Sequence, residues 1–292
     1  MQTLGSTRNQ VGESPVWRAD EQALYWVDIP QRRLQRWQDG RTTEWQAQQM
    51  LACIAPASRA GSWVAGMETG IYELRPQSDA SLLARPLAHI QHAAGNMRCN
   101  DGRCDRQGRF WVGTMVQDMG LASTAGALYR YDMTTGLSQV LDGLITPNGL
   151  AFSPDGRTMY LSDSHPSVQR VWAFDYDTRT GTPGNRRVFI DMNQYPGRPD
   201  GAAVDAEGCY WICGNDAGMV HRFRPDGSLD RSLEVPVRKP AMCAFGGPDL
   251  KHLFITSIKP PQPFAGYEAA PDGALLVTQV EVAGMPETPF RL

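Results

Sequence analysis

The sequence predicts an all-β protein, a six-bladed β-propeller with a metal site in its central channel. A phrase that ends in an aromatic strand recurs six times, at spacings of roughly 37 to 50 residues, which suit four-stranded blades. Glycine and proline are plentiful, at 29 and 21 residues, and this favours turns and short strands over long helices. One position of the phrase carries an oxygen donor in four of the copies.

The repeated phrase consists of a polar residue, a short apolar run, a turn and a strand with an aromatic residue. Its clearest copies span residues 13–27, 100–112, 148–161 and 200–212, and weaker copies span residues 53–64 and 242–255. Glycines at the turns support this interpretation, because Gly156 and Gly208 tolerate the positive φ that tight hairpins need. No segment predicts an amphipathic helix longer than about two turns.

Further segments complete the predicted blades. Residues 126–131 and 170–174 alternate in the manner of third strands. A closed ring must also join its ends, so residues 2–7 are expected to add a strand to the last blade, beside residues 273–280. The tryptophans on strands are predicted to be blade core: Trp26, Trp63, Trp111 and Trp211.

Length and composition limit the class of protein. The 292 residues are predicted to form one domain, 1–292, since all-β folds of this length often do. The net charge is -3 without a basic run, so nucleic acid is not an expected partner. No apolar stretch predicts a membrane span, and residues 1–11 lack the apolar part of a secretion signal. The six cysteines contain no C-x-x-C pair. We expect reduced cysteines, a cytoplasmic location and a monomer or weak homo-oligomer.

One repeat position, eight residues before the turn, carries oxygen donors. The donors are Glu13, Asn100, Asn148 and Asp200, and the matching turn residues are Glu21, Gly108, Gly156 and Gly208. In a propeller the equivalent ends of the blades point to one mouth of the channel, so these donors should meet there. Two carboxylates and two amide oxygens suit a hard divalent cation, above all calcium. The alternative is that Asn148-Gly149 and Asp200-Gly201 are simple turns.

Around these donors the sequence resembles the gluconolactonase and regucalcin family, also called senescence marker protein. The matching segments are residues 12–17, 98–102, 113–115, 147–150, 199–201, 174–177, 185–187 and 243–247. The resemblance covers nearly the whole chain in order. It implies a six-bladed propeller with one divalent cation, best fitted by Ca²⁺, with Zn²⁺, Mn²⁺ or Fe²⁺ as alternatives.

The resemblance also implies roles for individual residues. Glu13, Asn148 and Asp200 would be direct metal ligands, with Asn100 nearby. Arg98 and Asn100 would hold substrate hydroxyls, and so would Asp118, where the family more often has glutamate. The implied reaction is hydrolysis of a sugar lactone, a small molecule, to the aldonic acid. A cation can polarise the lactone carbonyl, Asp200 can act as general base, and Arg98 offers a rigid fork of donors. Otherwise Arg98 forms a salt bridge to a loop carboxylate.

Other functions remain open on the sequence alone. A serine hydrolase is disfavoured, because there is no G-x-S-x-G and the histidines share no repeat position. His165 follows an aromatic strand and either lines the site or lies on a surface loop. Two further alternatives are a metal-dependent phosphotriesterase and a non-catalytic propeller that binds calcium or a protein partner.

Overall fold

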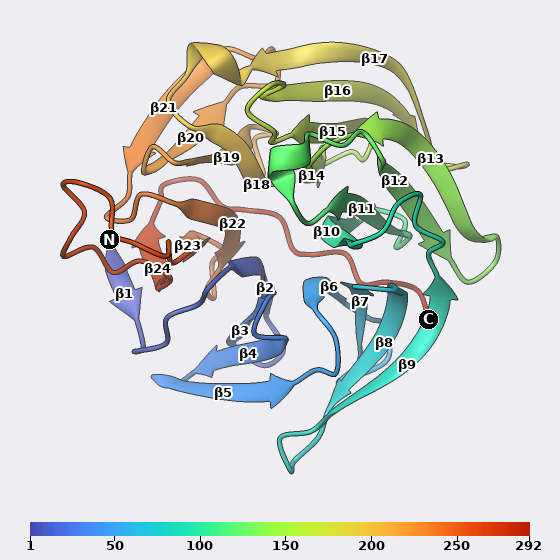
Figure 1. Cartoon of the computed structure of the whole chain (residues 1–292), viewed down its shortest axis with the longest axis horizontal. Coiled ribbons are helices and arrows are strands. Elements are labelled where there is room, and N and C mark those ends of the chain that lie inside the picture. The colour runs from blue at the N-terminus through green and yellow to red at the C-terminus, as the bar shows by residue number, and fades with distance from the viewer.

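The computed structural model describes residues 1–292 and contains six four-stranded antiparallel sheets around a common centre (Figure 1). The first three blades, from inner to outer strand, are β2 (Gly12–Arg18), β3 (Ala23–Asp28), β4 (Arg33–Gln38), β5 (Arg41–Gln46); β6 (Leu51–Pro56), β7 (Trp63–Met67), β8 (Gly70–Pro76), β9 (Leu82–His89); and β10 (Met97–Cys104), β11 (Phe110–Val116), β12 (Gly126–Asp132), β13 (Gly136–Leu144). The remaining three are β14 (Pro147–Phe152), β15 (Thr158–Asp163), β16 (Arg170–Asp177), β17 (Thr182–Asp191); β18 (Arg198–Val204), β19 (Tyr210–Asn215), β20 (Met219–Phe223), β21 (Leu229–Glu234); and β22 (Pro240–Gly246), β23 (His252–Ser257), β24 (Leu275–Gln279), β1 (Gln2–Leu4). The six-bladed propeller predicted from the repeats is therefore confirmed.

The ring closes through its N-terminus. Strand β1 pairs with β24, with Gln2 opposite Val277 and Leu4 opposite Leu275, so the first residues form the outer strand of the sixth blade. The predicted closure and the predicted third strands, now β12 and β16, are all confirmed. The only helical elements are two single 3₁₀ turns, η1 (Met119–Leu121) and η2 (Met192–Gln194), and neither is long or apolar enough to cross a membrane.

The core lies between neighbouring sheets. The four strand tryptophans predicted as blade core are at most 1% exposed: Trp26, Trp63, Trp111 and Trp211. They pack against aromatic residues of adjacent strands and blades, as Trp63 does against Tyr25 with ring centroids 4.5 Å apart. All six cysteines are buried and free, so packing rather than disulfides holds the blades together.

The C-terminal segment, residues 281–292, lies across the face where the inner strands end. Its backbone bonds to four blades near the ends of their inner strands: Gly284 N donates to Leu250 O at 2.8 Å, Phe290 N to Pro56 O at 2.7 Å and Arg291 N to Gly108 O at 3.1 Å, and Ala283 O accepts from Ala206 N at 2.9 Å. Phe290 is fully buried. In Figure 1 this red segment runs across the middle of the ring. We call the opposite face, where the inner strands begin, the site face.

Candidate active site on the site face

Each of the four predicted donors lies where its inner strand departs from regular pairing. Glu13 and Asn148 are the last paired residues before a register shift, whereas Asn100 and Asp200 lie inside one. Such bulges release residues from the hydrogen-bonded ladder and redirect them. Gly149 adopts φ 60° within β14, not in a hairpin turn. The alternative that Asn148-Gly149 and Asp200-Gly201 are simple turns is therefore wrong, because both pairs lie within strands.

The donors gather at the centre of the ring and are buried. Their exposed fractions are 9% for Glu13, 8% for Asn100, 5% for Asn148 and 5% for Asp200. Neighbouring blades are tied together at this level, because Asn100 Nδ2 donates to Pro147 O at 3.0 Å. The charges of Glu13 and Asp200, which come from the first and fifth blades, influence each other. The structure thus brings together residues that are far apart in the sequence.

The donors differ in how many of their oxygens are already engaged. Asp200 Oδ2 accepts from Asn215 Nδ2 at 2.5 Å, while Oδ1 has no protein partner. Glu13 Oε2 accepts only from Ser14 N at 3.2 Å, Oε1 is unpartnered, and the side chain of Asn148 makes no hydrogen bond. Asn100, in contrast, uses both side-chain atoms, because its Oδ1 accepts from Arg98 Nη1 at 2.8 Å. Three of these buried residues therefore keep a side-chain oxygen without a protein partner, and Asn100 does not.

Two carboxylates share this buried region without a cationic hydrogen-bond partner. Burial raises the pKa of Glu13 well above its usual value, and the negative charges of Asp200 and Asp101 raise it further. Burial also raises the pKa of Asp200, to about 7, although Arg198 and the Asn215 hydrogen bond oppose this effect. Like charges in a desolvated site disfavour ionisation, and a bound cation would remove that penalty.

The donor set fits a hard divalent cation. No group of three or more histidine, cysteine, aspartate and glutamate side chains is present, so a site of the zinc-finger type is excluded. The free oxygens of Glu13, Asn148 and Asp200 instead form a mixed carboxylate and amide set of the kind that calcium accepts. Their lack of protein partners is the structural observation that favours a ligand at this position.

Arg98 lies beside these donors at the start of the third blade. Its Nη1 donates to Cys99 O at 2.7 Å and to Asn100 Oδ1 at 2.8 Å, and its other nitrogens have no protein partner. The alternative in which Arg98 forms a salt bridge to a loop carboxylate is wrong, because it contacts no carboxylate within 4.0 Å. Burial lowers the pKa of Arg98, and the charge of Glu13 partly compensates.

Asp118 and His165 lie on two neighbouring loops of the site face. Asp118 is exposed and caps η1, since its Oδ1 accepts from Gly120 N at 3.0 Å. The His165 ring lies 3.1 Å from Met119 O through Nε2 and 2.7 Å from Ser167 Oγ through Nδ1. His165 thus joins the β15–β16 connection to the turn that carries Asp118. In Figure 1 this green turn lies beside the labels of β14 and β15, in front of the fourth blade.

Sequence reasoning missed several polar residues near the donors. Asn215 binds Asp200, and Arg198 binds Asp216 through an Nε–Oδ2 contact of 2.6 Å. Lys239 also contacts Asp216. One signal could have revealed Arg198, because it precedes Asp200 by two residues as Arg98 precedes Asn100. Asn215 carries no such signal, because only the pairing of β18 with β19 places it there.

Comparison with known proteins gives consistent matches over nearly the whole chain. Residues 11–259 match the sequence profile described as the SMP-30/Gluconolactonase/LRE-like region. A 6-deoxy-6-sulfogluconolactonase of Pseudomonas putida is 37% identical over 96% of this chain and 94% of its own. Regucalcin of Gallus gallus is 33% identical over 99% and 98%. The crystal structure of a regucalcin from Agrobacterium tumefaciens, described as a calcium-binding protein, has a TM-score of 0.91 at 29% identity, covering 99% of this chain and 97% of the other.

Proposed function

The chain belongs to the SMP-30/gluconolactonase/LRE-like family, and from this premise we propose that it hydrolyses a sugar lactone to the corresponding aldonic acid. The observation that carries the proposal is that three buried residues, Glu13, Asn148 and Asp200, each keep a side-chain oxygen without a protein partner. They meet where the inner strands begin, beside a guanidinium that has unused donors. Similarity to known lactonases supports lactone hydrolysis as the reaction. The free oxygens beside Arg98 support the site face as the place where this reaction occurs.

Glu13, Asn148 and Asp200 would hold one divalent cation. When bound, the cation would polarise the lactone carbonyl and stabilise the negative charge that develops on its oxygen. The two carboxylates would supply two negative charges, which match a dication. Calcium suits this oxygen set, and the regucalcin structure described as calcium-binding supports the same choice. Asn100 would stand beside the cation rather than bind it directly, since both its side-chain atoms are engaged.

Asp200 would serve as the general base. Asn215 donates to Oδ2 and fixes the carboxylate, and the two lone pairs of Oδ1 would serve the cation and the proton of the attacking water. Without a cation, burial raises the pKa of Asp200 to about 7, and a bound cation would lower it, so the carboxylate would be ionised at neutral pH and able to accept a proton. The water oxygen bonds to the carbonyl carbon, the bond from that carbon to the ring oxygen breaks, and Asp200 returns the proton to the ring oxygen. The product is an open-chain hydroxy acid.

Arg98, Asn100 and Asp118 would orient the sugar. Arg98 Nε and Nη2 have no protein partner, so they can donate to substrate hydroxyls. The Asn100 side chain fixes Arg98 by accepting from Nη1, and this keeps the donors of Arg98 in one direction. Asp118 lies on the exposed rim and would accept from a hydroxyl further from the carbonyl.

A panel of lactones tests the proposal. Initial rates would be measured with glucono-1,5-lactone, a pentonolactone and one organophosphate ester, with and without a chelator and after calcium is restored. Hydrolysis of a lactone that is lost on chelation and recovered with metal supports the proposal. Preference for the organophosphate would favour a phosphotriesterase. Metal binding without hydrolysis of any substrate would favour a calcium-binding propeller.

A further inference from the structure

Three cationic side chains occupy the same place on three different blades. Arg98 and Arg198 directly precede Cys99 and Pro199, which are the last paired residues before the register shifts of β10 and β18. Lys239 stands in the same way before Pro240 and the register shift of β22. All three therefore lie at the beginning of an inner strand, on the site face.

Two of these cations share a single carboxylate. Arg198 Nε lies 2.6 Å from Asp216 Oδ2, and Lys239 Nζ contacts Asp216 Oδ1. Their side chains are only 17% and 20% exposed, so water screens them incompletely. Asp272 is also near enough for the charge of Lys239 to act on its pKa, and Arg238 shares the Phe264 ring with Lys239. Arg198, Arg238 and Lys239 thus face Asp216 and Asp272, which leaves one positive charge in excess once a cation neutralises Asp200. We call Arg198, Asp216 and Lys239 the rim cluster.

Arg198 is held in one orientation and keeps a donor free. Its Nη1 donates to Ser164 O at 3.0 Å and to Ser164 Oγ at 3.1 Å, which ties the fifth blade to the fourth. With Nε on Asp216, only Nη2 has no protein partner. Such a fixed guanidinium with a free nitrogen suits recognition of an oxyanion. Because Arg198 lies two residues before Asp200, a molecule at Asp200 would also come near the rim cluster.

An aromatic segment covers the rim cluster from the side of the sixth blade. The β23–β24 connection carries Phe264 and Tyr267, whose ring centroids lie 5.2 Å and 5.6 Å from the Arg238 guanidinium. Lys239 Nζ lies 5.7 Å from the Phe264 centroid. The rings hold the two basic residues in place and reduce their contact with water, and a charge near apolar surface attracts an anion more strongly than in bulk water.

We propose that the rim cluster is a subsite for an anionic substituent on the sugar, so that the preferred substrates are acidic sugar lactones rather than neutral ones. The excess positive charge of the cluster and the free Arg198 Nη2 select the anion. Arg98 forms no salt bridge and adds a further positive charge at the same face, where Glu13 and Asp200 act on it only at longer range. This inference rests on the proposed function, because it assumes that the cation there neutralises Glu13 and Asp200.

The test compares a neutral lactone with two acidic ones. kcat/KM would be measured for glucono-1,5-lactone, 6-phosphoglucono-1,5-lactone and a glucarolactone, whose remote group is a carboxylate. We expect the wild-type protein to prefer both acidic lactones, and a rise in ionic strength to raise KM for them alone. Preference for only one of them would identify phosphate or carboxylate as the group bound.

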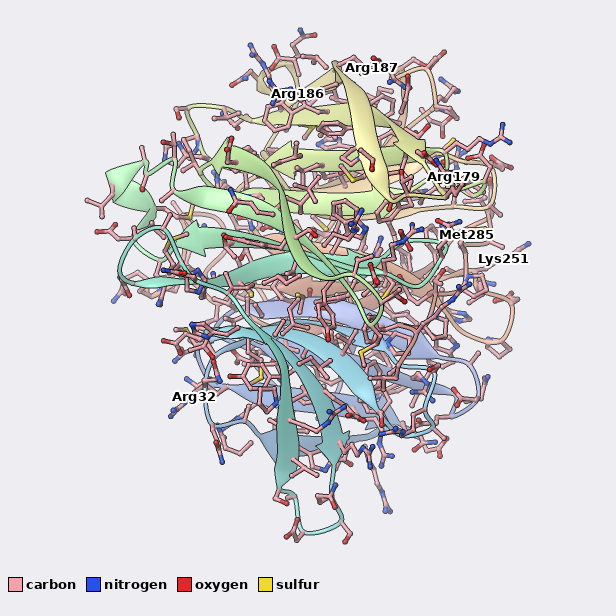
Figure 2. The ribbon with its side chains drawn as sticks, turned by 90° about the vertical axis from the view of Figure 1, so that its right-hand side faces the viewer. Arg32, Arg179, Arg186, Arg187, Lys251 and Met285 are labelled. Atoms are coloured by element: carbon pink, nitrogen blue, oxygen red, sulfur yellow. The ribbon has the colours of Figure 1, made fainter.

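Two variants alter the charge of the rim cluster in opposite directions. Lys239→Met should lower kcat/KM for the phosphorylated lactone roughly 10-fold more than for the neutral one, as loss of a charged hydrogen bond does. Asp216→Asn should lower KM for the phosphorylated lactone. The matched control is Lys251→Met, which removes the same charge on the opposite face. Arg32 lies in the β3–β4 connection on the site face, and Figure 2 shows Lys251 and Met285 on the other side of the molecule from it.

The outcomes of these experiments distinguish failure of the anion subsite from failure of the proposed lactone hydrolysis. Equal effects of Lys239→Met on the neutral and phosphorylated lactones, or an equal effect of Lys251→Met, would overturn the subsite. If no lactone is hydrolysed, the proposed function fails, and calorimetry with 6-phosphogluconate and gluconate still tests the subsite by itself. Tighter binding of 6-phosphogluconate that is lost in Lys239→Met would support it, and equal binding of the two acids would overturn it.

Discussion

Asp200 has one carboxylate oxygen held by Asn215 and one without a protein partner, and this division suits a residue with two tasks. The free Oδ1 keeps lone pairs for both a cation and the proton of a water molecule, while the bond from Asn215 stops the carboxylate from rotating. Asn148 and Glu13 also keep a free oxygen, whereas Asn100 has none. The four residues occupy one repeat position in the sequence, but their hydrogen-bond partners distinguish the three with a free oxygen from Asn100.

Replacement of the base should reduce turnover more than substrate binding. Asp200→Asn keeps an oxygen ligand but removes the proton acceptor, so kcat at saturating metal should fall by roughly 10²-fold or more. Arg98→Ala removes contacts made before the transition state and should chiefly raise KM. Steady-state kinetics over a series of metal concentrations would check both. Full activity of Asp200→Asn at saturating metal would refute the role of Asp200 as base.

Two asparagines at equivalent positions should respond differently to the same substitution. Asn148→Ala removes an oxygen that has no protein partner and should weaken calcium affinity by about 10-fold or more, as loss of a charge-assisted contact does. Glu13→Gln should act in the same direction. Asn100→Ala should raise KM through the loss of support for Arg98 while calcium affinity changes little. Calcium titration by calorimetry measures this difference, and equal losses of affinity would contradict it.

At the scale of elements, β-bulges and short connections position the site. The register shifts of β2, β10, β14 and β18 place the donors out of the regular ladder at the centre of the ring. The connections on the same face then carry the outer residues. η1 has no buried residue of its own, so its position depends on Asp118 as its cap and on the contact of His165 with Met119 O.

His165 is therefore predicted to act through Asp118 as a positioning residue. His165→Ala should raise KM about as much as Asp118→Asn does, because either change removes the same substrate contact. The double variant should be little worse than either single variant, which gives a coupling energy of roughly 0.5–3 kcal/mol, as for residues in one network. His165→Gln, which can still donate to Met119 O, is the control. Additive effects in the double-mutant cycle would contradict the positioning role.

At the scale of the whole molecule, the ring brings together charges that the unfolded chain keeps apart. β1 closes the sixth blade, and the C-terminal segment bonds to four blades on the opposite face. Closure holds Glu13 of the first blade near Asp200 of the fifth, with both buried. The metal-free protein thus carries an electrostatic cost at its centre that a dication would relieve.

That cost predicts how stability depends on pH. Burial raises the pKa of Asp200 from 3.8 to about 7, so between these values the folded protein keeps a proton that the unfolded chain has released. The contribution of Asp200 to the free energy of unfolding is fully present below about pH 4 and is lost as the pH rises to about 7. The raised pKa of Glu13 acts in the same direction. Calcium binds the ionised carboxylates and stabilises the folded state by mass action.

The increase in Tm on addition of calcium should therefore be larger at pH 8 than at pH 5. Differential scanning fluorimetry of chelated protein, with and without calcium at both pH values, measures it. Asn148→Ala serves as the control, because the protein then lacks one ligand and should show a smaller shift at both pH values. An equal Tm shift at pH 5 and pH 8 in the wild-type protein would contradict the carboxylate site.

The sequence by itself determined the six blades and the closing strand, and it placed Glu13, Asn100, Asn148 and Asp200 at one repeat position, because each of these depends on a local pattern repeated along the chain. A turn glycine such as Gly156 is required by the local backbone conformation, and a strand aromatic such as Trp211 is required by burial within its blade. Both requirements can be recognised from neighbouring residues in the sequence. Tertiary structure alone decided which donor oxygens are free, that Asn215 holds Asp200, and that Arg198 and Lys239 share Asp216. These contacts join different strands and blades, and no local pattern encodes a distance between segments that only closure of the ring brings together.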